Sequence, residues 1–372
     1  MPRVRRAAAA LAVLVTAACT GSGDGDRPAP RTGADGAPAL LGTVDLDAAV
    51  GGDARLLDLA AAPGDDPVAL LGDGGTRAWL IEVGPGEDGP TATTMLELPV
   101  VGDDAELSVL PGGSFLVAHT SPIAGYQLLT VPRDGQATVT ALGLRPDRAA
   151  TALSPDGRTL YAALTLTDLG PAQLLTVDLA AGVVTRTAPV VPDGTVPALA
   201  TRPDGGVAAL VESADGRALL TAYDADLRPV GEPVDLAPDA PVGTPAGLDV
   251  TADGTVVATL HVSDGRELGR LVTVADGAVA GSIELDGVGD SALEVVVSPD
   301  GGSAWVPQAD LSYPAELVTV DLASGERVSS VSLCAGAAVL GDVAPFGADA
   351  GLVATGSCVD GDGPQATAFL VG

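Results

Sequence analysis

A short turn phrase recurs along the chain at nearly even intervals. It reads "SPDG" from Ser154 and from Ser298, "RPDG" from Arg202 and "TADG" from Thr251, and successive aspartates of these copies lie 48, 49 and 47 residues apart. Proline presets a negative φ and glycine tolerates a positive one, so the phrase favours a tight chain reversal. Tight turns with a fixed period of this length are typical of a repeated supersecondary unit.

A second phrase keeps the same period. It reads "TVDLAAG" or "TVDLASG" in its clearest copies, and the copies begin at Thr130, Thr176, Thr221, Thr273 and Thr319. Between the phrases, short runs of Val, Leu, Thr and Ala are bounded by Gly, Pro and Asp, and no amphipathic helix is evident. Each unit therefore reads as four strands, for example 151–153, 159–166, 173–178 and 183–189.

Four antiparallel strands with a period in the forties describe one blade of a β-propeller. Six units begin near Leu56, Leu107, Thr151, Ala198, Leu248 and Leu293, and a seventh runs to the end of the chain with only three strands. The segment "LLGTVDLDAA" from Leu40 is similar to an outer strand and supplies the fourth. The sequence predicts one all-β domain over residues 40–372, a seven-bladed β-propeller closed by an N-terminal strand in the last blade.

The run "LSPDGRTLYAAL" followed by "LLTVDLAAGVVTRTAPV" resembles the repeat of bacterial YVTN-type propellers. These lie within a broad seven-bladed class that also holds quinoprotein-dehydrogenase-like proteins. The WD40-like type fits less well, because no Trp-Asp dipeptide closes a blade. The resemblance covers most of the chain and implies the fold, but its motifs are structural and assign no catalytic residue.

Residues 1–18 have the pattern of an export signal. Three arginines precede the apolar run "AAAALAVLV", and the small residues of "TAAC" lead to Cys19. Small residues directly before a cysteine resemble the lipobox of bacterial lipoproteins, which implies a lipid, palmitate included, on Cys19. The alternative is an ordinary secretory signal cleaved nearby. Residues 19–39 are rich in Gly, Pro and Asp and predict a flexible linker. The expected location is extracytoplasmic, on a membrane through the lipid anchor alone.

Composition constrains both the core and the classes of partner that the protein can bind. Hydrophobic residues make up 47% of the chain and aromatic ones 2%, so Val, Leu and Ala must fill most of the core. The net charge is −31, and it becomes −34 when the signal peptide with its three arginines is removed. A surface this acidic repels nucleic acid and anionic lipid, which excludes both as expected partners.

Two cysteines remain besides Cys19. Cys334 falls at the end of the fourth strand of unit six, and Cys358 at the end of the second strand of unit seven. Both ends point to the same face, here called the top, on adjacent blades, so we predict a disulfide between them. A catalytic or metal-binding thiol is not favoured, because no histidine neighbours either cysteine in sequence.

The two histidines, His119 and His261, fall near the ends of second strands in blades two and five. They are candidates for a top-face site, with exposed loop-edge positions as the alternative. Acidic loops at 286–290 and 360–363 lack the spacing of a calcium-binding EF-hand. The sequence predicts neither a metal nor a cofactor.

No Ser nucleophile motif, phosphate-binding loop or zinc spacing is present, so no catalytic residue is predicted. The pattern favours a binding or assembly scaffold for another cell-envelope protein, a small ligand or a glycan. A sensor-like ectodomain beside a membrane partner is a further alternative. So is an enzyme, a lactonase-like hydrolase or a quinoprotein-like oxidoreductase with its site at the channel mouth. Fold alone does not decide among these hypotheses.

Overall fold

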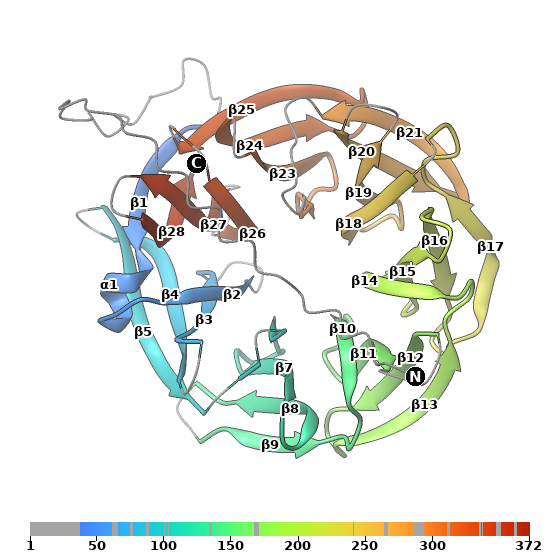
Figure 1. The fold of residues 1–372 in the computed structure, drawn as a ribbon, viewed down its shortest axis with the longest axis horizontal. Coiled ribbons are helices and arrows are strands. Elements are labelled where there is room, and N and C mark those ends of the chain that lie inside the picture. The colour runs from blue at the N-terminus through green and yellow to red at the C-terminus, as the bar shows by residue number, and fades with distance from the viewer. Residues whose placement is uncertain are drawn as a thin grey trace, which may run out of the picture.

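Seven four-stranded antiparallel sheets radiate from a central axis in the computed structural model (Figure 1). It describes residues 38–372 apart from 62–65, 75–76, 87–88, 100, 103, 134–135, 167–170, 241, 264–266, 286–293, 311–312, 335, 337, 347–350 and 361–362. The predicted seven-bladed β-propeller is confirmed. In blades 1 to 6 the strand nearest the axis comes first in the sequence and the strand at the rim comes last.

The strands of the first four blades have the following bounds. Blade 1 holds β2 (Arg55–Ala60), β3 (Val68–Gly72), β4 (Ala78–Gly86) and β5 (Gly89–Leu98), and blade 2 holds β6 (Glu106–Val109), β7 (Phe115–Ser121), β8 (Gly125–Val131) and β9 (Thr138–Ala141). Blade 3 holds β10 (Pro146–Leu153), β11 (Thr159–Leu166), β12 (Gln173–Asp178) and β13 (Val183–Pro189), and blade 4 holds β14 (Gly194–Thr201), β15 (Val207–Ser213), β16 (Ala218–Tyr223) and β17 (Pro229–Asp235). Three of the four strands predicted for blade 3 have these same bounds.

The remaining blades bring the two ends of the domain together. Blade 5 holds β18 (Val242–Val250), β19 (Val256–Ser263), β20 (Glu267–Ala275) and β21 (Ala278–Leu285), and blade 6 holds β22 (Val296–Val297), β23 (Ser303–Asp310), β24 (Tyr313–Asp321) and β25 (Glu326–Cys334). Blade 7 holds β26 (Ala338–Phe346), β27 (Gly351–Asp360), β28 (Gly363–Val371) and the N-terminal strand β1 (Leu40–Asp45).

β1 closes the ring as the sequence predicted. It pairs antiparallel with β28, with Leu40 opposite Val371 and Asp45 opposite Thr367. The strand ends earlier than expected, because the one-turn helix α1 (Leu46–Val50) follows directly. Asp45 caps this helix by accepting a hydrogen bond from the Ala48 amide at 3.0 Å. Among the described residues, no helix is long and apolar enough to cross a bilayer.

The core is divided among the seams between blades. The described residues form seven clusters of buried apolar side chains, one between each pair of neighbouring blades. Between blades 1 and 2, for example, Leu70 and Leu80 pack with Phe115 and Val117. Because every blade contributes to two clusters, no blade has a complete core of its own. The domain's stability therefore depends on a closed ring.

The repeated turn phrase is structural. Ser154 Oγ donates to Asp156 Oδ1 at 2.7 Å, and the Arg158 amide donates to the same carboxylate oxygen at 3.1 Å. Gly157 has φ +66°, a conformation that glycine adopts without strain. The copy at Ser298 repeats the pattern, with Ser298 Oγ 2.5 Å from Asp300 Oδ1. These aspartates order the turns that join the first strand of a blade to its second.

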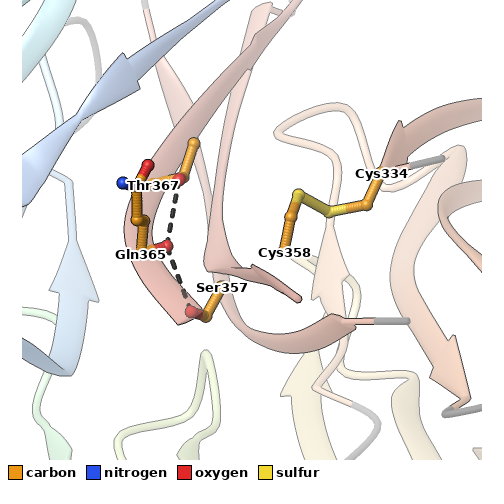
Figure 2. The surroundings of a disulfide bond; sticks show 5 residues. All are labelled: Cys334, Ser357, Cys358, Gln365 and Thr367. Atoms are coloured by element: carbon orange, nitrogen blue, oxygen red, sulfur yellow. Dashed lines mark hydrogen bonds between the residues drawn. A yellow bond between two sulfur atoms is a disulfide. The ribbon is translucent and has the colours of Figure 1, made fainter. Parts of the chain in front are cut away.

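The predicted disulfide is confirmed, and it crosses the seam between blades 6 and 7. Cys334 ends β25, Cys358 lies near the end of β27, and their Cα atoms are 5.8 Å apart. Figure 2 shows the bond beside the β27–β28 pair, where Ser357 Oγ donates to the Gln365 carbonyl at 3.1 Å. The bond thus ties the strand at the rim of blade 6 to the blade that holds both ends of the domain.

Removing the disulfide should destabilise the folded propeller. The cysteines are 24 residues apart, and closing a loop of that length should stabilise the folded state by about 3 kcal/mol. We expect Cys334→Ser with Cys358→Ser to lower the urea unfolding midpoint, and dithiothreitol to lower that of the wild type. The double variant in dithiothreitol is the control, since it has no bond left to reduce. A wild-type midpoint that reductant does not change would contradict the prediction.

Candidate functional site

A cavity of about 550 Å³ lies on the propeller axis. The first strand of every blade contributes residues to its lining. In blade 6 these are Val296 of β22 and the two residues before it, Glu294 and Val295. The walls are therefore the strands closest to the axis in Figure 1. Because each blade contributes one or a few residues, a side chain placed there faces its counterparts from the other blades.

Five carboxyl groups face this cavity: Asp58, Glu106, Asp249, Glu294 and Asp342. They come from blades 1, 2, 5, 6 and 7, which are consecutive around the ring. Blades 3 and 4 close the circle with neutral side chains that include Thr151 and Pro197. The described lining contains no Arg, Lys or His, so acidic groups converge there without a basic partner.

Two of these aspartates make the same pair of hydrogen bonds. Asp249 Oδ1 accepts from the Val250 amide at 2.7 Å, and its Oδ2 accepts from the Val297 amide of blade 6 at 2.7 Å. Asp58 likewise accepts from the Leu59 amide at 2.7 Å and from the Leu107 amide of blade 2. Each carboxyl group therefore bridges its own strand and the innermost strand of the next blade. We call this arrangement an axial latch.

Glu106 makes a third latch. Its Oε2 accepts from the Thr151 amide of blade 3 at 2.7 Å and from the Thr151 hydroxyl. An innermost strand has an amide edge that no strand of its own blade covers, and a buried amide without an acceptor costs free energy. The latches supply these acceptors from the neighbouring blade, which explains why acidic residues occur on strands that are otherwise apolar.

The seam between blades 7 and 1 has a carboxyl group on each side. Asp58 lies on blade 1 and Asp342 on blade 7, and both line the cavity. Burial raises the pKa of Asp58, and the charge of Asp342 raises it further. Burial also raises the pKa of Asp342.

The other channel acids have raised pKa values for the same main reason. Burial raises the pKa of Glu106 to about 7, against the hydrogen bonds from Thr151. Burial raises the pKa of Glu294 to about 8, with the charges of Asp342 and Glu106 adding to the effect. Burial raises the pKa of Asp249 as well. Near neutral pH the channel therefore contains fewer negative charges than carboxyl groups.

The structure does not bring the two predicted histidines to this site. His119, on β7, is only 1% exposed, and its Nδ1 accepts from the Gly102 amide at 3.0 Å. That bond places the ring hydrogen on Nε2, and burial lowers the His119 pKa. His261 lies on β19 opposite Gly269 and is half-buried. Neither histidine is among the described residues that line the cavity.

The prediction from sequence missed the channel acids, although a signal was present. The segments that contain the channel acids read "LLDLA", "AELSV", "GLDVT", "ALEVV" and "LGDVA", each with one acid inside an apolar run. The equivalent segments of blades 3 and 4 read "ATALS" and "ALATR", without an acid. Once blades are aligned by their turns, the strand nearest the axis is known, and a lone acid there must face the axis or a seam.

A metal centre is not indicated by the described part of the chain. No group of three or more His, Cys, Asp or Glu there is arranged to hold an ion. The five channel acids are distributed around the walls, and backbone amides donate to Asp58, Glu106 and Asp249 among them. Residues 286–290 and the middle of the 360–363 loop, considered above as calcium candidates, lie outside the described residues.

Comparison with known proteins supports the class of fold. No family model matches the sequence, and neither does any curated protein. Among solved structures, hydrazine synthase of Kuenenia stuttgartiensis superposes with a TM-score of 0.60 at 14% sequence identity, over 80% of this chain and 92% of that chain. In total, 1050 chains of solved structures match the fold of this chain. The protein is a seven-bladed β-propeller, and at this identity the likeness concerns the fold alone.

The axial latches should contribute measurably to stability. Asp249→Ala leaves the Val297 amide without its acceptor, so we expect a loss of about 1–3 kcal/mol in the free energy of unfolding, measured with urea. Asp249→Asn keeps one oxygen acceptor and should therefore lower the free energy of unfolding by less than Asp249→Ala does. The control is Glu284→Ala on the exposed face of β21, which makes no described latch. Equal stability of Asp249→Ala and the wild type would show that the latch contributes nothing.

Proposed function

We propose that this protein is a lipid-anchored, extracytoplasmic β-propeller that binds a cationic segment of another cell-envelope protein in its central channel. One observation carries the proposal, namely the axial cavity into which five carboxyl groups converge with no basic side chain among its described lining residues. Acids gathered on low-dielectric walls focus a negative potential and attract positive groups. A positively charged partner would also neutralise their mutual repulsion.

The cavity and its acids favour an organic cation over a bare metal ion. About 550 Å³ is within the range of pockets that hold small molecules or several side chains. The acids stand on five different blades, and no three of them in the described part of the chain are arranged to hold a metal ion. Carboxylates on different blades suit guanidinium or ammonium groups that are spread along a peptide, because each positive group can find its own partner. A small cationic ligand or an amino-sugar glycan would use the same chemistry.

Two features support an extracytoplasmic location. The Cys334–Cys358 disulfide is of the kind that forms and persists in oxidising compartments. The sequence pattern of residues 1–19 supports export and lipid attachment at Cys19, and these residues lie outside those that the structure describes. Together they favour a propeller held at the outer side of a membrane by its tether.

Hydrolysis is the second candidate, because one observation favours it. Asp58 and Asp342 line the same cavity, and burial raises the pKa of both, so the site can hold a carboxylic acid and a carboxylate, the two forms that general acid and general base catalysis require. The described cavity lining offers no histidine or cysteine to act with them. Turnover in a lactone or glycoside screen that Asp342→Asn abolishes would favour this candidate over binding.

Lipid attachment can be tested on the full-length chain. In a bacterial host, we expect the wild type to incorporate labelled palmitate and to sediment with membranes. Cys19→Ala should incorporate none and appear in the soluble extracytoplasmic fraction, because one cysteine would carry all acyl groups. Cys358→Ser is the matched control and should stay with the membranes. Palmitate labelling of Cys19→Ala would contradict anchoring at this residue.

Binding can be tested by titrating a tetra-arginine peptide into the protein and measuring the affinity by calorimetry at physiological ionic strength. Glu106→Gln with Glu294→Gln removes two channel carboxyl groups that a bound cation would hold in the ionised form, and it should lower the affinity by about tenfold or more. Glutamine keeps an oxygen that can accept the hydrogen bonds from Thr151, so the fold should be retained.

The control for this experiment removes the same net charge from the surface. Glu97→Gln with Glu284→Gln changes two exposed side chains on β5 and β21 and should leave the affinity unchanged. A tetra-glutamate peptide should not bind. Equal losses in both double variants would mean that the peptide responds to net charge alone, and the channel would be excluded as its site.

A further inference from the structure

A second cavity, of about 830 Å³, lies at the seam between blades 4 and 5 and shares no lining residue with the axial cavity. On blade 5, the β18–β19 turn and the β20–β21 turn line it. On blade 4, its lining extends from Arg202, directly after the strand nearest the axis, to residues 230–234 of β17 at the rim. Neighbouring strands are about 4.8 Å apart, so a cavity that extends from the first strand to the fourth is about 14 Å long. We call it the blade 4–5 groove.

The outer wall of the groove is an enlarged β-bulge. In blades 1, 3, 5 and 6, the fourth strand has one more residue than the third strand at this point. In blade 4, Thr221 alone lies opposite residues 231–233 of β17, so this bulge has two extra residues. Gly231 has φ +78°, a conformation that glycine adopts without strain. Because a bulge bends its strand and redirects side chains, the shape of the groove comes from blade 4 itself and not from the common repeat.

The groove is lined by apolar side chains and has a cationic group at its inner end. The apolar side chains come from the third and fourth strands of blade 4 and from two strands of blade 5: Leu220, Val230, Pro233, Val234, Val256 and Val274. Arg202 Nη2 pairs with Asp204 Oδ2 at 2.9 Å, whereas its Nη1 is buried and has no hydrogen-bond partner among the described residues. A ligand oxygen at Nη1 would therefore gain a charge-assisted hydrogen bond and satisfy a buried donor.

The surrounding charges favour a neutral oxygen over an anionic one. Asp204 already balances the charge of Arg202, and three exposed acids line the groove as well: Glu232, Asp253 and Asp276. These acids repel a carboxylate ligand such as a fatty acid, but they do not repel a peptide carbonyl. An extended peptide advances about 3.4 Å per residue, so about four residues would fill the groove.

We propose that the blade 4–5 groove binds an extended, uncharged apolar segment of a partner protein, about four residues long, with one backbone carbonyl accepting a hydrogen bond from Arg202 Nη1. The apolar lining, the buried donor and the enlarged bulge carry this proposal together. Binding would also cover Val230, an apolar residue that is 47% exposed. The groove is separate from the axial cavity, so the proposal does not depend on cation binding there.

The groove is tested with the neutral peptide acetyl-Ser-Val-Leu-Val-Ser-amide, titrated into the protein and followed by calorimetry. Val230→Trp fills the groove from an exposed position, and we expect it to lower the affinity by about tenfold or more. The matched control is Val279→Trp. Val279 is 40% exposed at the same position of the bulge in blade 5, and it does not line the groove. This variant should bind the peptide as the wild type does.

A second variant tests the hydrogen bond. Arg202→Met removes the donor and keeps an apolar chain of similar length, so the affinity should fall by about tenfold. Arg228→Met is its control, because Arg228 has a side chain that is 76% exposed on the same blade and does not line the groove. Urea unfolding of each variant confirms that the propeller is folded.

Three outcomes overturn the proposal. The first is no binding of the peptide to the wild type at millimolar concentration. The second is equal affinity of Val230→Trp and Val279→Trp, which would place the peptide elsewhere. The third is binding of octanoate, but not of the peptide, that Val230→Trp abolishes, since the ligand would then be an anionic amphiphile. Equal affinity of Arg202→Met and Arg228→Met overturns the assigned hydrogen bond. The result with tetra-arginine is independent of all these outcomes, because it depends on the axial cavity.

Discussion

The pairing of β1 with β28 is the constraint on which the remaining structure depends. Every buried cluster lies between two blades, so each blade needs a neighbour on both sides. Without β1, blade 7 would have an open edge at the place where the ring must close. The disulfide from Cys334 to Cys358 reinforces the adjacent seam. Backbone pairing within blade 7 and a covalent bond to blade 6 thus hold in place the blade that contains both ends of the domain.

The axial latches extend this closure to the inner side of the ring. Aliphatic side chains fill the seams, and with so few aromatics the packing alone offers little directional specificity. Hydrogen bonds from Val297 to Asp249 and from Thr151 to Glu106 fix how neighbouring innermost strands align. The resulting arc of acids on five consecutive blades is therefore a consequence of how the blades are joined, and it also gives the channel its acidic character.

The sequence predicted most of the fold and little of the site, for a physical reason. The turn at Ser154 and the strands of blade 3 depend on local turn chemistry and alternation, which a single sequence displays directly. The Cys334–Cys358 pair followed from the blade register alone. Asp58 and Asp342 are 284 positions apart in the chain and line one cavity only because the ring closes. The direction in which an isolated acid points, across a seam or toward the axis, is set by this closure and not by its neighbours in sequence.

The same carboxyl groups hold the seams and face the cavity, so the state of the channel and the stability of the ring are linked. Asp58 accepts from the Leu107 amide of blade 2, and the charge of Asp342 on blade 7 raises its pKa, so both neighbouring blades act on it. Anything that changes its charge acts on the alignment of both neighbours. Ionised acids that the fold brings together repel one another, so the protonation of the channel acids and the stability of the ring depend on each other. The chemistry of the axis and the integrity of the ring therefore have the same structural origin.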